Sequence, residues 1–91
     1  MRVRLTKVAI AELNEIYVYI TNDNPSAARA VVRQVEYVID RIRDFPEMAR
    51  STNDEGVRIF PVMPFPYLVF YTVGRGEVII RNVRHAGRIR P

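Results

Sequence analysis

The hydrophobic period of the chain changes near residue 56, and this change sets the class of fold. Between residues 9 and 42, apolar side chains recur every three or four positions, as on one face of an α-helix. From residue 57 onwards, they form short runs rich in β-branched and aromatic residues, as strands do. Helices that precede most of the strands predict an α+β fold, with helices on one face of a sheet and a partly covered groove on the other.

A short strand and a first helix are predicted at the N-terminus. Val3 and Leu5 alternate with arginines, as in a strand with one buried face. Thr6 can then cap a helix of about four turns. Its apolar side chains form a stripe at helical spacing: Ala9, Leu13, Ile16, Tyr17 and Ile20. Glu12 lies largely off this stripe.

A second helix is predicted to follow at once. Asn24 supplies an N-cap side chain, Pro25 suits the first helical position, and Phe45-Pro46 ends the helix. Its apolar stripe is Ala28, Val31, Val32, Val35, Val38, Ile39 and Ile42. Because the connection is short, the two helices should form an antiparallel hairpin.

Three strands are predicted in the second half of the chain, after a polar loop at residues 47–56. They are Val57–Val62, Tyr67–Val73 and Val78–Arg84. The segment Gly74-Arg75-Gly76 reads as a hairpin turn, so the strands should form an antiparallel meander. The middle run is apolar at nearly every position, which places it at the centre of the sheet.

Length and composition limit the classes of function. A chain of 91 residues fits one domain, expected over residues 1–91, with no room for a separate cofactor domain. It contains no cysteine and one histidine, so we expect no disulfide, no metal site and no cofactor. No apolar run approaches the roughly 18 residues of a membrane span, which leaves a reducing cytoplasm as the expected location.

The positive charge is concentrated in the last third of the chain. Residues 56–91 carry six arginines against Glu77 alone, a net charge of +5, whereas residues 1–55 carry eight basic and nine acidic side chains. Thirteen of the fourteen basic residues are arginine, whose planar fork suits carboxylate or phosphate. This favours an anionic partner, either nucleic acid or an acidic protein surface. The alternative is a solvated basic face without a specific partner.

Six short patterns follow one another along the chain. They are Ala9-x-x-Glu12-Leu13-x-x-Ile16-x-x-Tyr19-Ile20, Asn24-Pro25-x-Ala27-Ala28, Phe45-Pro46, Arg58, Pro66-Tyr67-x-x-x-Tyr71 and Val83-Arg84-His85-x-x-Arg88. In this order, and with the predicted elements, they resemble the ParE/RelE superfamily of bacterial toxin–antitoxin toxins. The ParE-like branch is the more similar one.

The resemblance implies that the chain is a toxin held inactive by a cognate antitoxin. The C-terminal segment of the antitoxin would wrap around the toxin. A basic domain with apolar side chains on both sheet faces suits an acidic, amphipathic segment that folds on binding. Arg58, Tyr67 and Tyr71 are the residues expected to contact the antitoxin. RelE-like members of the superfamily cleave messenger RNA on the ribosome, whereas ParE-like members inhibit DNA gyrase.

RNA cleavage needs a general base, a general acid and positive charge that converge on one phosphate. His85 is the candidate for proton transfer, with Arg58, Arg84 and Arg88 as phosphate clamps and Tyr71 as a second proton relay. However, the chain has a single lysine, and an alanine follows His85 where the cleaving branch often places tyrosine. The structural alternative is a histidine at the end of a strand, hydrogen-bonded to a neighbouring carbonyl or carboxylate.

The ParE-like interpretation is preferred, and it predicts a gyrase inhibitor that catalyses no reaction itself. The residues expected to contact an acidic surface of the target, or its DNA, are Arg81, Arg84, Arg88 and Arg90. Each of them could instead be a solvated charge on an exposed strand or tail. Two alternatives stay open: a ribosome-dependent messenger-RNA endonuclease, and a binding module derived from such a toxin that has lost toxicity.

Overall fold

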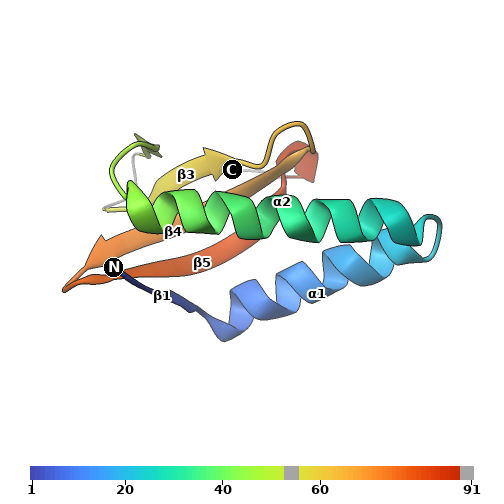
Figure 1. Ribbon diagram of the computed structural model, residues 1–91, viewed down its shortest axis with the longest axis horizontal. Helices are drawn as coiled ribbons and strands as arrows, with labels where there is room; N and C mark the ends of the chain where they lie inside the picture. The colour runs from blue at the N-terminus through green and yellow to red at the C-terminus, as the bar shows by residue number, and fades with distance from the viewer. Residues whose placement is uncertain (53–55, 89–91) are drawn as a thin grey trace.

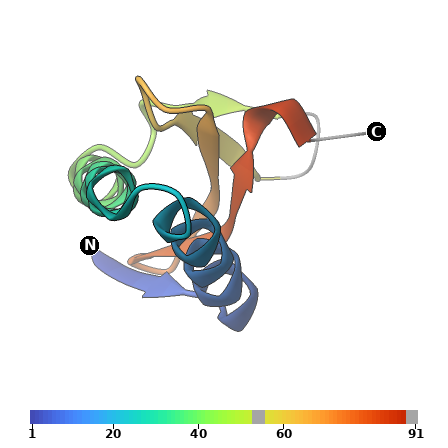
Figure 2. The same ribbon diagram turned by 90° about the vertical axis from the view of Figure 1, so that its right-hand side faces the viewer.

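The computed structural model describes residues 1–52 and 56–88 of the chain (Figure 1). In chain order the elements are β1 (Arg2–Leu5), α1 (Lys7–Thr21), α2 (Pro25–Asp44), β2 (Arg50–Ser51), β3 (Arg58–Pro61), β4 (Tyr67–Gly74), β5 (Glu77–His85) and the 3-10 helix η1 (Ala86–Arg88). Figure 2, which looks along the helices, shows both of them on the same side of the sheet. The α+β class and the helical hairpin are therefore confirmed.

The five strands form one mixed sheet in the order β1-β5-β4-β3-β2. Neighbours pair antiparallel from β2 to β5, which confirms the predicted meander and the central place of β4. β1 joins the edge of β5 in parallel. Arg75 and Gly76 adopt positive φ angles of 51° and 77° between β4 and β5, as a tight two-residue hairpin turn requires.

The predicted loop at residues 47–56 is wrong in one respect, because it contains β2. In this strand Arg50 pairs with Ile59 and Ser51 pairs with Arg58. A strand of two polar residues at the edge of a sheet has no hydrophobic alternation, so the sequence pattern cannot reveal it. The predicted basic tail likewise begins with the turn of η1, and residues 89–91 lie outside the described part of the chain.

Local capping sets where both helices begin. The Oγ1 atom of Thr6 accepts a hydrogen bond from the Ala9 amide at 3.0 Å, and Asn24 Oδ1 accepts one from the Ala27 amide at 3.1 Å. Thr6 also ties the start of α1 to the sheet, since its amide donates to the Ile80 carbonyl at 3.0 Å. Neither helix of the described residues is long and apolar enough to cross a membrane.

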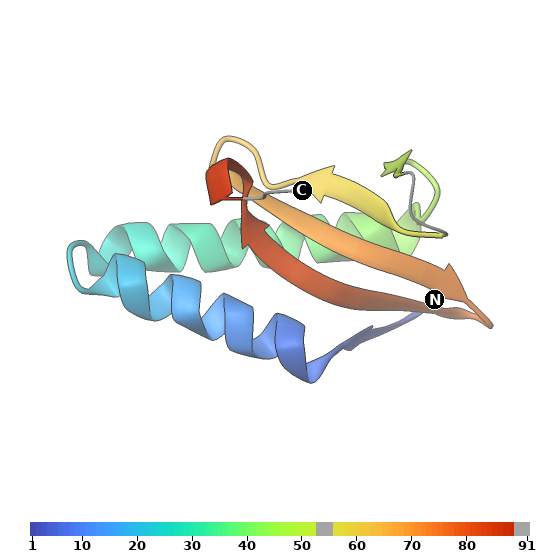
Figure 3. The same cartoon turned by 180° about the vertical axis from the view of Figure 1, so that it is seen from behind.

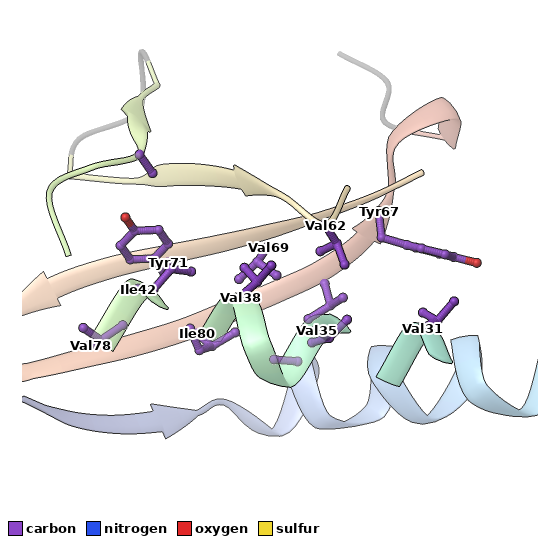
Figure 4. Packing of buried hydrophobic residues seen from close by; sticks show 13 residues of the cluster. Val31, Val35, Val38, Ile42, Val62, Tyr67, Val69, Tyr71, Val78 and Ile80 are labelled. Atoms are coloured by element: carbon purple, nitrogen blue, oxygen red, sulfur yellow. The ribbon is translucent and has the colours of Figure 1, made fainter. Parts of the chain in front are cut away.

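The core lies between α2 and the sheet. Figure 4 shows Val35, Val38 and Ile42 of α2 directed at side chains of β4 and β5. The residues that are at most 1% exposed are Ala9, Ala28, Val35, Ile42, Val62, Val69, Tyr71, Val78, Ile80 and Val83. Tyr17 was predicted on the apolar stripe of α1, but it is 38% exposed.

Candidate functional site

We call the face of the sheet opposite the helices the open face. In Figure 3 the sheet lies in front of α2, so the open face is on the viewer's side. The strand register and the burial pattern place apolar side chains at its centre: Ile59, Leu68, Phe70 and Ile79. The arginines on the same face are Arg2, Arg4, Arg50, Arg81 and Arg84. An apolar centre with arginines around it is the kind of surface that binds an acidic macromolecular partner.

A β-bulge decides which arginines of β5 reach the open face. Phe70 pairs with Asn82, but the next residue, Tyr71, pairs with Ile80, so Arg81 is the extra residue of the bulge. Strict alternation would put residues three apart on opposite faces. With the bulge, Arg81 and Arg84 lie on the same face.

Glu12 of α1 binds the edge of β5 where β1 has ended. Its Oε1 atom accepts hydrogen bonds from the Val83 amide at 3.0 Å and from Asn82 Nδ2 at 3.1 Å. Its Oε2 atom forms an ion pair with Arg84 Nε at 3.2 Å. The sequence pattern does not reveal this role. The position of Glu12 off the apolar stripe was the available signal, but it does not identify a partner 70 residues away.

The guanidinium groups of Arg81 and Arg84 are each held through the Nε atom. Arg81 Nε donates to Thr72 Oγ1 at 3.1 Å, and Arg84 Nε donates to Glu12 as described. Arg84 also lies over the Phe70 ring, with its Cζ atom 5.8 Å from the ring centroid. The side chain of Arg84 is nevertheless 50% exposed, so both arginines remain accessible from the open face.

His85 ends β5 and packs within the protein. Its Nδ1 atom accepts a hydrogen bond from the Gly87 amide at 3.0 Å, so the neutral ring carries its proton on Nε2. Its ring meets the Tyr67 ring edge-on, with the centroids 5.3 Å apart. The sequence left open that His85 has a structural role, hydrogen-bonded at the end of a strand to a carbonyl or carboxylate. The observed hydrogen bond is of this structural kind, but its partner is the Gly87 amide.

Gly87 packs closely against the His85 ring. A Cβ atom added there would lie 3.2 Å from His85 Cε1 and 3.3 Å from Nδ1, so the ring would have to shift. We expect Gly87→Ala to expose the residue 87 amide to faster hydrogen exchange and to lower stability by less than about 1 kcal/mol. Gly74→Ala is the matched control, because nothing lies within 4 Å of its added Cβ. Equal exchange in both variants at residue 87 would contradict the close packing.

Tyr71 and Arg58 fasten the segment that follows α2. Tyr71 is fully buried, and its hydroxyl donates to the Pro46 carbonyl at 2.7 Å. Arg58 Nη1 donates to the carbonyls of Ala49 at 2.7 Å and Glu47 at 3.2 Å. Burial raises the pKa of the Tyr71 hydroxyl above its ordinary value of 10.0, while the Arg58 guanidinium and a backbone hydrogen bond with Ala49 oppose this rise.

The raised pKa of Tyr71 makes stability depend on pH in alkaline solution. Above about pH 10 the unfolded chain loses the phenolic proton while the folded chain still holds it, so the unfolded state gains stability. The contribution of Tyr71 is therefore complete below pH 10 and falls as the pH rises towards the folded-state pKa. We expect wild type to lose more free energy of unfolding than Tyr71→Phe between about pH 9 and 11 in urea titrations. Parallel curves would show that Tyr71 ionises equally in both states.

The structure brings two of the proposed nuclease residues together and keeps His85 apart from them. The register places Arg58 opposite Tyr71 near the middle of β4, and His85 opposite Tyr67 at the start of that strand. Those two positions of β4 are four residues apart, which separates them by about 13 Å. Arg84 is near His85 in sequence but lies on the open face. The side chain of Arg88, and all of Arg90, lie outside the described residues.

The roles assigned to these residues from sequence remain predictions. Tyr67 and Tyr71 are 8% and 0% exposed, so the structure gives both of them a place in the core. Across residues 1–52 and 56–88, no three His, Asp or Glu side chains are grouped so that they could hold a metal ion.

A second feature of the surface is a hollow between α1, α2 and β1. Its volume is about 280 Å³, and it is lined by Leu5, Ile10, Leu13, Asn14, Tyr17 and Val32. Four of these lie on one face of α1, which explains why Ile10 is 55% exposed despite its apolar side chain. The hollow lies away from the open face.

The helical hairpin packed on a five-stranded sheet is a fold seen in a solved structure, the chromosomal ParDE TA system from P. aeruginosa. The TM-score is 0.76 and the identity 20%, over 93% of this chain and 95% of that one. At the level of sequence, the model of the family "ParE toxin of type II toxin-antitoxin system, parDE" matches residues 3–90. The chain belongs to this family.

Relatives of known sequence agree with this family. Y4kP of Sinorhizobium fredii (strain NBRC 101917 / NGR234) is 33% identical over 85 residues, which are 93% of this chain and 88% of the relative. The toxin RelE2 of Caulobacter vibrioides (strain ATCC 19089 / CIP 103742 / CB 15) is 33% identical over 81 residues, 89% of this chain and 90% of the relative. The resemblance to ParE/RelE toxins is thus confirmed.

Proposed function

We propose that this toxin stops growth by binding DNA gyrase through the open face, without catalysing a reaction of its own. The observation that carries the proposal is the open face itself, where exposed Arg81 and Arg84 stand beside half-buried Leu68 and Phe70. Such a surface provides charge for recognition and apolar area for affinity. Nothing in this interpretation requires a proton-transfer pair.

The arrangement of titratable groups supports inhibition over cleavage. General acid–base catalysis needs both groups within hydrogen-bond reach of one phosphate. His85 lies opposite Tyr67, four residues along β4 from the pair of Arg58 and Tyr71, and the Tyr71 hydroxyl is buried against Pro46. These positions suit structural roles better than an active site.

The proposal includes a cognate antitoxin that keeps the toxin inactive in the cytoplasm. The ParE family takes its name from a two-component toxin–antitoxin system, and a related fold is seen in a ParDE structure. An acidic antitoxin segment would neutralise the net charge of +4. Arg58, which is half-buried, and Tyr67, which is 8% exposed, are the contacts proposed for it. Tyr71 was expected to join them, but at 0% exposure it offers a partner no surface.

Ribosome-dependent cleavage of messenger RNA is the second candidate. It is favoured by one relative, the toxin RelE2, which is 33% identical over nearly its whole length. In that case His85, Arg58, Arg84 and Tyr71 would form the active site, and the strand ends would have to rearrange on the ribosome.

Purified toxin without antitoxin would be added to gyrase with relaxed plasmid and, in parallel, to a translating-ribosome reaction. We expect loss of supercoiling with intact messenger RNA, unchanged by His85→Ala and weakened about 10-fold or more by Arg84→Glu. Codon-positioned cuts that His85→Ala abolishes, with normal supercoiling, would overturn the proposal. No effect in either reaction, and harmless expression without antitoxin, would identify a module that has lost toxicity.

A further inference from the structure

We propose that Arg81 and Arg84 form one binding site for carboxylate groups of an acidic protein segment, and that Thr72 and Glu12 hold the two guanidinium groups in place. The identity of the segment as part of gyrase rests on the proposed function. The chemistry of the site does not, and it can be tested without gyrase.

The terminal nitrogens of both arginines are available to a ligand. Among the described residues, each guanidinium is hydrogen-bonded through Nε alone, Arg81 to Thr72 and Arg84 to Glu12. No described residue is bonded to the Nη1 or Nη2 atoms of either arginine. An arginine held in this way keeps its two terminal nitrogens for a bidentate contact with a carboxylate. Because both side chains are already ordered, binding a ligand costs less side-chain conformational entropy than it would with two mobile arginines.

Glu12 and Thr72, which hold the two arginines, come from parts of the fold that are themselves fixed. Glu12 accepts two further hydrogen bonds from β5, so its carboxylate cannot turn away from Arg84 without breaking them. Thr72 is a residue of the central strand β4, directly opposite Ile79. The bulge of β5 at Arg81, opposite Phe70 and Tyr71, then places both arginines on the same side of the sheet.

The surface around the two arginines favours a protein segment over a single-stranded nucleic acid. Single-stranded nucleic acid is bound in part through bases stacked on exposed aromatic rings. On this face the one ring of the strand centre is Phe70, and the Arg84 guanidinium already covers it. The remaining surface around the pair is aliphatic, from Leu68 and Ile79, which suits apolar side chains that alternate with acidic ones. Five arginines on the open face against Glu12 and Glu77 favour an acidic segment.

The site can be tested by NMR on the full chain. The arginine Nε–H resonances would be followed while a synthetic peptide that alternates Glu and Leu is added, with a Gln and Leu peptide of equal length as control. We expect saturable shifts of the Arg81 and Arg84 signals with the acidic peptide only. Equal shifts with the Gln peptide, or tighter binding of an oligothymidylate at the same two signals, would overturn the proposal.

Variants separate the contact residues from the residues that position them. Arg81→Glu and Arg84→Glu should each lower the affinity for the acidic peptide about 10-fold or more. Arg33→Glu is the matched control, an exposed arginine of α2 with no bond to a described residue. It should change the affinity less than about twofold, since surface charges far from the contact are screened.

The positioning role has its own conservative control. Thr72→Val removes the hydroxyl that accepts from Arg81 and should weaken binding about threefold or more, whereas Thr72→Ser retains it and should restore the affinity and the Arg81 Nε–H shift. Glu12→Gln should broaden the Arg84 Nε–H signal and lower the affinity for the peptide. The thermal midpoint of each variant is measured alongside, as a control for stability. Normal affinity in both Thr72→Val and Glu12→Gln would overturn the positioning role.

Gyrase itself gives the last comparison. If gyrase binds wild type and the Arg33→Glu variant but not the Arg81→Glu and Arg84→Glu variants, the acidic segment belongs to gyrase. If all four bind gyrase equally, gyrase does not bind through Arg81 and Arg84, and both the assignment of the segment to gyrase and the open-face contact of the proposed function are wrong. If wild type shows the peptide response but does not bind gyrase, the site stands and the proposed target is wrong.

Discussion

Tyr71→Ala is expected to lower the free energy of unfolding by about 3–5 kcal/mol. Tyr71 is the largest side chain of the core with no exposed surface, and alanine would leave a cavity between α2 and β4 that this rigid sheet cannot close. The variant would also leave the Pro46 carbonyl without its donor. On a domain of this size, such a loss is a large part of the total stability.

Urea titration of wild type, Tyr71→Ala and Tyr71→Phe measures this effect. The phenylalanine variant fills the cavity and removes only the hydroxyl, so it should lose about 1 kcal/mol. It should also keep toxicity, because the hydroxyl faces the segment after α2 and not a partner. A Tyr71→Phe variant as stable as wild type but without toxicity would instead mean that the hydroxyl acts in the function.

The helices and the meander of β3, β4 and β5 could be predicted because the signals that set them are local. Thr6 and Asn24 cap the helices through amides only three residues away. The apolar stripe of α2 is continuous from Ala28 to Ile42, and the Gly74-Arg75-Gly76 turn joins β4 to β5 as expected. The start of each helix therefore follows from interactions of this range.

The parts that could not be predicted depend on distant partners. β2 is a strand only because β3 lies beside it. The bulge that brings Arg81 and Arg84 to one face is a property of the pairing with β4, and no residue type in β5 marks it. A strand that is apolar at nearly every position, such as β4, likewise does not reveal which of its side chains are buried.

Tyr71 illustrates this limit for the site. It was assigned a functional role because it lies in a pattern shared with toxins, together with Tyr67. The structure places both on the helix-facing side of β4, whereas Leu68 and Phe70 between them face the open side. The same pattern serves a structural role here, since a tyrosine can fill the core and satisfy a backbone carbonyl at once.

Glu12→Ala is expected to lower the free energy of unfolding by about 2–3 kcal/mol, more than the usual loss for a helix residue with a polar side chain. Its carboxylate serves a backbone amide, a side-chain amide and a guanidinium, and its side chain is only 22% exposed. Alanine would leave the Val83 amide and Asn82 without an acceptor where β1 no longer covers β5. The ion pair with half-exposed Arg84 contributes a smaller share.

Hydrogen exchange at the Val83 amide separates the parts of this effect. Glu12→Gln keeps an oxygen for that amide, so the amide should stay protected from exchange and the free energy of unfolding should fall by only about 1 kcal/mol. Glu12→Ala should lose the protection of the amide as well as the larger part of the stability. Glu15→Ala, on the exposed side of the same helix, controls for the change in helix propensity. If Glu12→Ala and Glu15→Ala were equally stable, α1 would be held to β5 by its apolar stripe and Thr6 alone, and Glu12 could not be the group that fixes Arg84.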